Sequence, residues 1–502
     1  MRNGRTPFYT GLRGVNAVLL CSSLLGGCVA APSVPPRSTV TEVTQPAEGA
    51  AVSGDAAPTQ WWRLYNEPAL DALVTEALTN NRDLRVAEAN LLKARAILGE
   101  ARGDRIPQTE LSAGVGYGST LQDQIAAAAK GVSSARTGTR YDLGADISWE
   151  LDLFGRLRSN VRAARADVRA SAALEDGVRI SIAAGVTGAW LDACGFAHRA
   201  DVARQSLALA ERGRDTTERL RAAGATNSAD VLRADALVAQ ARAAIPMLDA
   251  ARLDALAELA VLTGHPPTEI APAAAACRTL PQISAIVPVG DGRALLRRRP
   301  DVRAAEQRLA AGTARIGIAV SDLYPRIAIG GMAADSAGTP SDLGNRNNLV
   351  WRFGPLLSWS FPNVSAARAR LRYARAAEAG ALAEFDGAIL TALKEVNQRA
   401  EDYAALLHRQ SALRDALDRS QHADRLTRIQ RAAGAATALE ALDADRTVIE
   451  AQANLASVDR DVAAAQVALF KALGGGWELA PVVRLPTPDR SATAATSNPS
   501  SK

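Results

Sequence analysis

The chain contains few aromatic residues: tryptophan, tyrosine and phenylalanine together make up 4% of its 502 residues. Hydrophobic residues make up 48%, and much of that share is alanine. A thick globular core needs large side chains, whereas alanine lets helices approach one another closely. The composition therefore indicates long, closely packed helices more than a thick globular core.

Motifs of catalytic and metal sites are also lacking. None of the four histidines stands in a metal-ligand spacing such as His-Glu-x-x-His, and no Gly-x-Ser-x-Gly or Walker A run occurs. The histidines are His198, His265, His408 and His422. We therefore expect no enzyme activity, no cofactor and no metal ion.

A strong excess of one charge is absent too. Lysine and arginine number 58 against 53 aspartates and glutamates, a formal net charge of +5. Three of the arginines lie in the N-terminal leader described next, and removing them leaves +2. This balance predicts no nucleic-acid partner.

The N-terminus has the pattern of a secretory leader. Three arginines precede an apolar stretch at Val15–Leu25, which ends in the run Leu-Gly-Gly-Cys28. The run resembles a lipobox, in which the leader is cut before a cysteine that carries diacylglycerol. We therefore expect lipidation at Cys28, with a plain secretory leader as the alternative.

Only four cysteines occur, and two of them are accounted for by this leader: Cys21 would leave with it and Cys28 would be lipidated. Cys194 and Cys277 remain. An oxidising periplasm would permit a disulfide between them. Cys194 falls in a helical run and Cys277 in a loop, and the sequence does not show whether the two lie close together. Whether they form a disulfide is therefore left undecided by the sequence.

The chain is a tandem duplication. Residues Asn81–Glu88 align with Arg299–Glu306 at an offset of 218, which also places Pro107 on Pro325. After a loop that is shorter in the second copy, the offset becomes 210, so Ser148 falls on Ser358 and Gly264 on Gly474. One change of offset aligns the two halves throughout.

Six segments follow from this alignment and from composition. They are a signal peptide at 1–27, a lipidated N-terminus and flexible tether at 28–58, a first repeat at 59–264, a linker at 265–290, a second repeat at 291–478 and a disordered tail at 479–502.

Each repeat begins with a helix, at Arg82–Gly103 or Asp301–Ser321, and later contains a very long helical run. The first long run, 156–223, has no proline. Such a helix is stable only when it packs along neighbours. Apolar residues seven apart in the second returning helix indicate a coiled-coil seam. Pro246 should kink or interrupt the corresponding helix of the first copy.

Four segments alternate between apolar and polar residues, as half-buried strands do. The strong ones are Tyr141–Leu153 and Leu349–Phe361, and the weaker ones Thr109–Tyr117 and Ile327–Ala333. Their length suits membrane-spanning strands, and the chain's aromatics gather there. Pro355 cannot donate to a ladder, which predicts a bulge or an unpaired position.

Four strands cannot close a barrel, and an open sheet edge in lipid leaves amides without partners. The subunit must therefore oligomerise. Two copies would fill the barrel interior with side chains, whereas three leave a lumen, so a conduit favours the trimer. Because both helical hairpins share the periplasmic side, residues 118–140 and 335–348 should form the extracellular loops.

Several runs resemble the TolC family of outer-membrane efflux proteins, most closely its lipoprotein branch of the NodT type. These are Trp61-Trp62 with Asn66–Leu73, Ser148–Gly155, Arg298–Arg303, and Gly354-Pro355 ahead of Ser358-Trp359. The resemblance covers the chain from about 60 to 478. It implies an α+β membrane protein, in which a trimeric twelve-stranded β-barrel with four strands per subunit continues into a periplasmic α-helical coiled-coil barrel.

The resemblance also implies a location and partners. The chain would be a lipid-anchored subunit of a homotrimer in the Gram-negative outer membrane. It would dock to a periplasmic adaptor and an inner-membrane transporter, most often of the resistance-nodulation-division type. Two alternatives remain: the outer-membrane channel of a type I secretion system, and a periplasmic adaptor lipoprotein.

In this family the periplasmic end is closed at rest by residues of the inner hairpin. The turns at Gly224 and Gly434 are the hairpin ends farthest from the strands, and six would meet there in a trimer. Asp230 lies just beyond the first turn. Leu439 lies beyond the second, and it becomes a candidate constriction because smaller residues precede it.

Three charged residues follow Leu439 and complete the set of gate candidates. Asp443 and Arg446, three apart on a helix, are expected to pair locally. Asp445 is expected to reach a neighbouring subunit or to ring the aperture. A solvated helix face is the alternative for each of them.

Overall fold

The computed structural model describes residues 32, 34–40, 52–53, 55, 58–119, 121–283, 287–288, 296–362, 364–483 and 485. The predicted signal peptide, Cys28 and most of the C-terminal tail lie outside these residues. The chain divides into two compact units. Of the described residues, those within 32–37, 96–166 and 309–382 belong to unit 1, and the others belong to unit 2.

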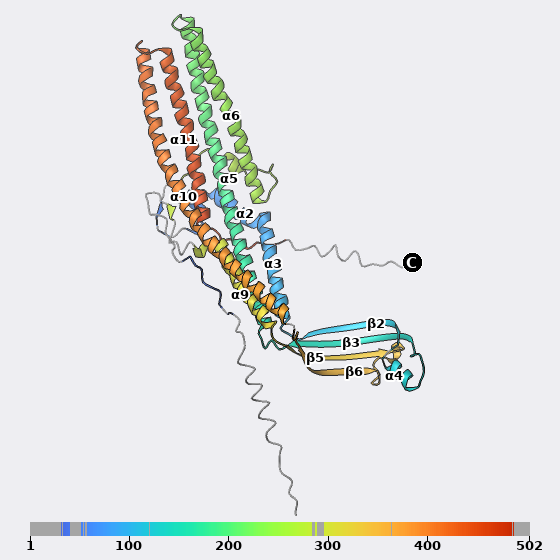
Figure 1. The fold of residues 1–502 in the computed structure, drawn as a ribbon. Helices are drawn as coiled ribbons and strands as arrows, with labels where there is room; N and C mark the ends of the chain where they lie inside the picture. The colour runs from blue at the N-terminus through green and yellow to red at the C-terminus, as the bar shows by residue number, and fades with distance from the viewer. Residues whose placement is uncertain are drawn as a thin grey trace, which may run out of the picture. The chain divides into compact units, whose positions relative to one another are not determined.

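Long helices supply most of the described residues (Figure 1). The predicted helix α3 (Arg82–Gly103) has the expected bounds, and α9 (Pro300–Ser321) starts one residue early. The two longest are α5 (Arg156–Ala222) and α10 (Ser365–Ala432), of 67 and 68 residues. Each is followed by a returning helix, α6 (Ser228–Thr263) or α11 (Ala438–Ala472).

The other described elements are short. They are β1 (Val52–Ser53), η2 (Trp61–Tyr65), α2 (Pro68–Asn80), α4 (Leu121–Ala129), α7 (Pro272–Ala276), β4 (Val287–Pro288) and η3 (Pro340–Asp342).

Within the described residues, α5 is the one helix with an apolar window long enough to cross a membrane. However, 72% of that window is buried inside the subunit. Ala183, Val186 and Cys194 are fully buried in the hydrophobic core of unit 2. The burial identifies α5 as a core helix, since lipid does not need to cover a face that protein already covers.

Unit 1 contains an antiparallel sheet in the order β2-β3-β5-β6. Its strands are β2 (Gln108–Gly118), β3 (Gly138–Glu150), β5 (Arg326–Ala337) and β6 (Leu349–Ser358). All four predicted strands are confirmed, although β3 and β6 end three residues early. After β3 the chain turns at Asp152, whose φ is 47° and whose carboxylate accepts from the Leu157 N–H at 2.8 Å. This carboxylate caps the start of α5.

The sheet is a single layer within the described residues, and apolar side chains on one of its faces are open. Leu111 is 85% exposed, Tyr117 78% and Trp351 72%. All three stand at odd positions, as the alternation predicted. A soluble protein would cover such a face, whereas a membrane strand presents it to lipid.

The sequence predicted a bulge or an unpaired position at Pro355; it causes no bulge and stays in register opposite Ile329, because the β5·β6 register runs through it without a shift. The Leu151 N–H donates to the Ile327 carbonyl at 3.0 Å, so the backbone groups of Ile327, and of Ile329 two residues on, point toward β3. Ile329 is the register partner of Pro355. Pro355 and Ile329 are therefore not hydrogen-bonded to each other. The N–H group that proline lacks would point away from β5, at the open edge of β6.

Equivalent residues of the two copies make the same contact beside the sheet. The Trp149 indole N–H donates to the Arg105 carbonyl at 3.0 Å, and the Trp359 indole N–H donates to the Leu323 carbonyl at 3.3 Å. Trp149 corresponds to Trp359 at the offset of 210, and Arg105 to Leu323 at 218. The duplication seen in the sequence is thus a duplication of contacts.

In unit 2 the short helix η2 docks onto α11. The rings of Trp61 and Phe470 stack with their centroids 4.9 Å apart. The Tyr65 hydroxyl donates to the Gln466 amide oxygen at 3.2 Å, and the Gln466 amide nitrogen donates to the Tyr403 hydroxyl at 3.0 Å. Each of these three buried polar side chains therefore has a hydrogen-bond partner.

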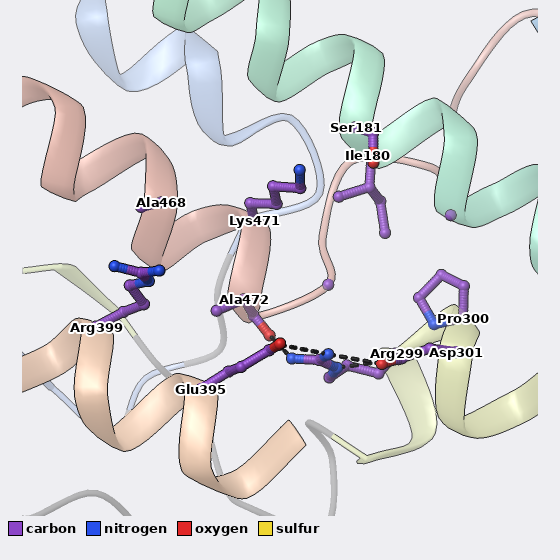
Figure 2. A pocket seen from close by; sticks show the side chains of 12 residues that line it. Ile180, Ser181, Arg299, Pro300, Asp301, Glu395, Arg399, Ala468, Lys471 and Ala472 are labelled. Atoms are coloured by element: carbon purple, nitrogen blue, oxygen red, sulfur yellow. Dashed lines mark hydrogen bonds and ion pairs between the residues drawn. The ribbon is translucent and has the colours of Figure 1, made fainter. Parts of the chain in front are cut away.

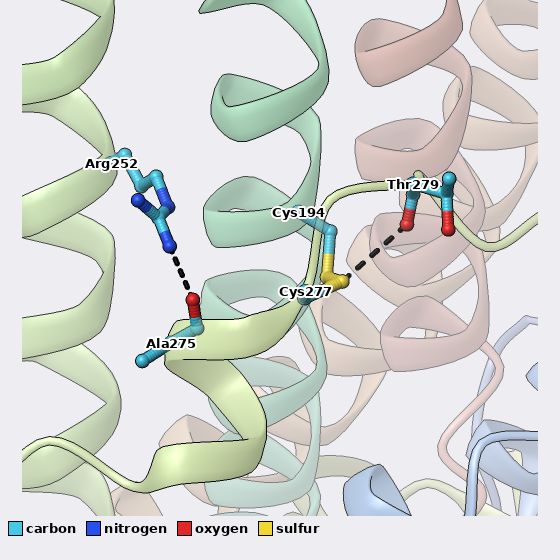
Figure 3. Close-up of a disulfide and its surroundings, with 5 residues drawn as sticks. All are labelled: Cys194, Arg252, Ala275, Cys277 and Thr279. Carbon is cyan, nitrogen blue, oxygen red and sulfur yellow. Dashed lines mark hydrogen bonds between the residues drawn. A yellow bond between two sulfur atoms is a disulfide. The ribbon is translucent and has the colours of Figure 1, made fainter. Parts of the chain in front are cut away.

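The structure decides the open cysteine question: Cys194 and Cys277 form a disulfide, with their Cα atoms 5.1 Å apart (Figure 3). Cys194 lies on α5 and Cys277 directly follows α7. Beside the bridge, the Arg252 guanidinium donates to the Ala275 carbonyl. The bridge and this hydrogen bond both fix the segment between the repeats to the helices of the first copy.

Helix α6 continues through Pro246, so the interruption that was one predicted outcome does not occur. Proline lacks an N–H and cannot bond to the Arg242 carbonyl four residues earlier. Near this position Arg204 on α5 lies 2.7 Å from Asp249 on α6, an exposed ion pair between the two helices. The second copy has Ala456 at the equivalent position.

Candidate functional site

The two hairpin turns have the same backbone structure. Gly224 and Gly434 adopt φ values of 72° and 75°, a region that favours glycine. The Ala225 N–H donates to the Leu220 carbonyl at 2.8 Å, and the Ala435 N–H donates to the Gln430 carbonyl at 2.8 Å. In both, carbonyls at the end of the ascending helix find donors in the turn.

The helix after each turn is capped in a different way. Asn227 accepts from the Asp230 N–H at 3.1 Å at the start of α6. Thr437 and Glu440 form a capping box at the start of α11, with the Thr437 N–H 2.6 Å from the Glu440 carboxylate. Both turns are therefore closed structures in which the first amides of the returning helix are satisfied.

Asp230 belongs to this capping network. Its carboxylate accepts from the Thr226 hydroxyl and from Arg233 at 2.7 Å. The hydrogen bond from Thr226 and then the charge of Arg233 lower the pKa of Asp230, so the group stays ionised. The structure thus gives Asp230 a local role in the turn.

Asp445 lies inside the subunit, which differs from the expectation that it reaches a neighbour or rings the aperture. It is 7% exposed, and its Oδ1 lies 2.6 Å from Arg428 on α10. A Cβ at Gly213 of α5 would lie 3.2 Å from its Oδ2. Asp445 therefore joins three helices, and the absent side chain at Gly213 makes room for it.

Burial raises the pKa of Asp445 to about 6, although the neighbouring Arg428 opposes the shift. Asp424 approaches the same guanidinium and raises the pKa further. Asp445 also lines a hollow of about 540 Å³ whose other charged residues are Arg212, Asp215, Arg219, Arg428 and Arg431. Cations thus outnumber the carboxylates around Asp445.

The predicted pairing of Asp443 with Arg446 is wrong. Arg446 lies 2.9 Å from Glu450, one turn further along α11, where the i,i+4 spacing aligns the two side chains. The Asp443 side chain is exposed. Leu439 is also exposed, by 51%, in the first turn of α11. Both residues are open to an approaching surface.

The sequence did not identify Arg428 and Asp424, which stand four apart on α10 and hold Asp445 in place. Arg428 lies 2.9 Å from Asp424 in addition to its contact with Asp445. Their spacing was a detectable signal of a helical ion pair. The link to Asp445, seventeen residues away, depends on how the hairpin folds back.

A second hollow, of about 530 Å³, lies in unit 2 around Arg299 (Figure 2). Arg299 is 8% exposed and lies 2.6 Å from Asp301 and 2.7 Å from Glu395. It also donates to the Ala472 carbonyl at 3.0 Å. Arg299 therefore clamps the start of α9 to α10 and to the end of α11, which is a structural role for the Arg-Pro-Asp run.

The chain matches known outer-membrane proteins over most of its length. The profile of the family described as "Outer membrane efflux protein" matches residues 73–265 and 292–475. Outer membrane protein OprJ of Pseudomonas aeruginosa is 32% identical over 470 residues, covering 93% of this chain and 96% of that protein. Nodulation protein T of Rhizobium leguminosarum bv. trifolii is 28% identical over 461 residues, covering 91% and 96%.

A solved structure of the outer-membrane channel OprN superimposes on the chain with a TM-score of 0.79 at 35% identity. The match covers 89% of this chain and 100% of that one. The four-stranded sheet and the paired long helices are therefore those of an outer-membrane channel subunit.

Proposed function

The chain belongs to the outer membrane efflux protein family, and we propose that three copies form the passive exit duct of a tripartite efflux pump. The open apolar face of the sheet carries this proposal. Leu111, Tyr117 and Trp351 lose contact with water only if lipid covers them. The two unpaired edges of the sheet require partner subunits in the same barrel.

The duct works without a reaction of its own. Membership of the outer membrane efflux protein family and the match to a solved outer-membrane channel support this proposal. Energy for export must therefore come from an inner-membrane transporter, reached through a periplasmic adaptor. The family match also argues against the adaptor alternative, because adaptors are a different class of protein.

The gate would lie at the hairpin turns. The Arg428–Asp445 ion pair joins the two helices of the second hairpin, and the Asp445 carboxylate lies beside Gly213 of α5. Asp443 and Leu439 are exposed at the same end, where they can meet their equivalents from the other subunits. Opening would require this end of the second hairpin to move, with Leu439 as the apolar constriction.

The N-terminus would add a lipid anchor through Cys28. Shortly after that residue, the chain is held on unit 2: the Ser38 and Thr39 hydroxyls each donate to the Asp386 carboxylate at 2.6 Å. Val40, the next residue, packs in the small apolar cluster around Ile389. A segment fixed at this point is compatible with a tether that leads to the membrane.

Deletion of the gene followed by complementation tests the proposal. Loss of the chain should sensitise cells to exported compounds and leave secretion of large proteins intact, whereas a type I secretion channel would show the reverse. The purified protein should migrate as a heat-modifiable trimer from outer-membrane fractions. Fractionation with the inner membrane, as monomers, would contradict the proposal.

A further inference from the structure

The hollow beside Asp445 holds more positive charge than its own carboxylates neutralise. It lies near the turns of the two helical hairpins, and its volume is about 540 Å³. Its charged lining residues are the arginines Arg212, Arg219, Arg428 and Arg431 and the aspartates Asp215 and Asp445. The first two arginines belong to α5 and the other two to α10, so positive charge faces the hollow from two helices.

Both aspartates of the hollow already have a cationic partner. Asp445 lies 2.6 Å from Arg428, which also binds Asp424 at 2.9 Å. Asp215 lies 3.1 Å from Arg214, which does not line the hollow. The carboxylates are thus paired with Arg428 and Arg214.

The other three arginines form no ion pair with a described residue. Arg219 donates only to the backbone carbonyl of Asp215, at 3.2 Å. The Nη2 atom of Arg431 is shielded from water, and no described residue accepts a hydrogen bond from it. A buried donor without an acceptor is costly, and a water molecule would satisfy the donor while leaving its charge unopposed. The missing partner is therefore an acceptor that carries negative charge.

The first copy of the repeat shows what the second copy lacks. Arg221 is equivalent to Arg431 at the offset of 210, and it lies 2.7 Å from Glu218. The residue equivalent to Glu218 is Arg428. Both Arg221 and Arg431 stand in the last turn of a helix, where a cation is favourable. Helix position alone therefore does not explain why a second guanidinium replaces the carboxylate three residues before Arg431.

We propose that this hollow binds a phosphate-class oxyanion with more than one negative charge between the guanidinium groups of α5 and α10. A guanidinium donates to two oxygens of a phosphate at once, which suits arginine to this class of ligand. Because Asp215 and Asp445 repel an anion, a single charge gains little net attraction, and divalent or higher anions bind in preference to chloride. The hollow has room for pyrophosphate together with water.

A bound oxyanion would link two helices that the second hairpin otherwise joins mainly through Asp445. Arg212 and Arg219 reach it from α5, and Arg431 reaches it from α10. Occupancy would thus hold the ends of α5 and α10 together. The site does not depend on the proposed exit duct, because binding requires no transport.

Calorimetric titration of the purified full-length protein with pyrophosphate tests the proposal, at constant ionic strength in sodium chloride. Pyrophosphate should bind at one site per subunit and inorganic phosphate more weakly. Arg431→Gln should weaken the binding by about tenfold, since it removes a charge-assisted hydrogen bond. Arg221→Gln is the matched control: it removes the equivalent arginine of the first copy, which Glu218 already pairs, and should leave the affinity unchanged.

Hydrogen exchange of the same samples locates the ligand. Pyrophosphate should increase protection of the backbone amides around Arg212–Arg219 and Arg428–Arg431 and leave those of α6 unchanged. Protection spread evenly over all helices would contradict a defined site.

Three outcomes would overturn the proposal. One is the absence of pyrophosphate binding at constant ionic strength, and another is an equal loss of affinity in Arg221→Gln and Arg431→Gln, which would indicate general attraction to a basic surface. If Arg431→Gln does not assemble on native gels, the exposed residue Arg212 decides, and unchanged affinity in Arg212→Gln is the third. A protein that binds pyrophosphate but fails to restore efflux would contradict the proposed function and support this site.

Discussion

Asp445 accepts a hydrogen bond from Arg428 at 2.6 Å, and this ion pair joins the two helices of the second hairpin near their turn. Gly213 on α5 leaves the space that the carboxylate occupies. The Asp445 side chain is buried whereas Arg428 is 51% exposed, so separating the two helices would bring the Asp445 carboxylate into water. A movement of α11 away from α10 would therefore have to break this pair near the turn.

The first prediction concerns pH. Burial raises the pKa of Asp445 to about 6 from 3.8. If opening brings the group into water, its pKa falls, so the closed hairpin binds the proton more tightly than the open one. Lowering the pH from about 6 to about 4 should therefore favour the closed state, and this contribution is lost as the pH rises through about 6.

Hydrogen exchange of the first turns of α11, corrected for the intrinsic effect of pH, measures this balance. Protection should increase from about pH 7 to about pH 5. Asp445→Asn should remove the increase, whereas Asp443→Asn, which alters an exposed carboxylate on the same helix, should retain it. Equal pH dependence in the two variants would rule out Asp445 as the titrating group.

The second prediction concerns conductance. Asp443→Ala combined with Asp445→Ala should leave trimers intact and raise single-channel conductance in planar bilayers. Asp445→Ala alone should account for most of the increase, because it removes the side chain that lies beside Gly213 and contacts Arg428, whereas protonation leaves that side chain in place. Unchanged conductance in well-assembled trimers would remove both aspartates from the gate, and Leu439→Ala would then be the next variant to measure.

The third prediction concerns the N-terminus. If Cys28 is the acylated residue, Cys28→Ala should abolish incorporation of labelled palmitate. Export activity should largely persist, since the barrel anchors itself in the membrane. A labelled Cys28→Ala protein would contradict the lipobox interpretation. Val29 follows the cysteine, so the wild-type protein should sort to the outer membrane.

The fourth prediction concerns topology. Ser134 lies in the loop between α4 and β3, which is far along the chain from both hairpin turns. An epitope tag inserted beside Ser134 should bind antibody on intact cells. A tag beside Gly224 is the matched control and should be reached only after the outer membrane is permeabilised. The opposite pattern would reverse the orientation of the barrel.

The fifth prediction concerns the disulfide between Cys194 and Cys277, which are 83 residues apart. A closed loop of this size restricts the unfolded chain, so losing the bridge should cost about 2–4 kcal/mol. Thermal unfolding of the solubilised protein with and without reductant measures the loss. Cys277→Ser should lose as much as Cys194→Ala with Cys277→Ser, and strictly additive losses would show that no bridge links them.

Features that repeat along the chain could be predicted well from the sequence. The helix Arg82–Gly103 and all four strands were found because hydrophobic spacing follows the local backbone geometry. The duplication was visible because equivalent residues keep equivalent roles, as Trp149 and Trp359 do. Such information lies within a few residues and needs no knowledge of distant neighbours.

Contacts between distant segments could not be predicted in this way. The sequence left Cys194 and Cys277 unassigned and paired Arg446 with the wrong residue. It also predicted that Asp445 reaches a neighbouring subunit or rings the aperture, whereas the residue is buried against Arg428. Each of these side chains had several possible partners, and the sequence does not show which of them lies beside it in the folded chain.

The sequence by itself thus determined the repeated units, the two faces of each strand and the positions of the turns, because these depend on local periodicity. Only the tertiary structure decided that Asp445 is buried against Gly213 and paired with Arg428, and that Pro355 leaves the register intact. The physical reason is that burial and backbone direction depend on which neighbour occupies each side of a helix or strand. No single segment carries that information.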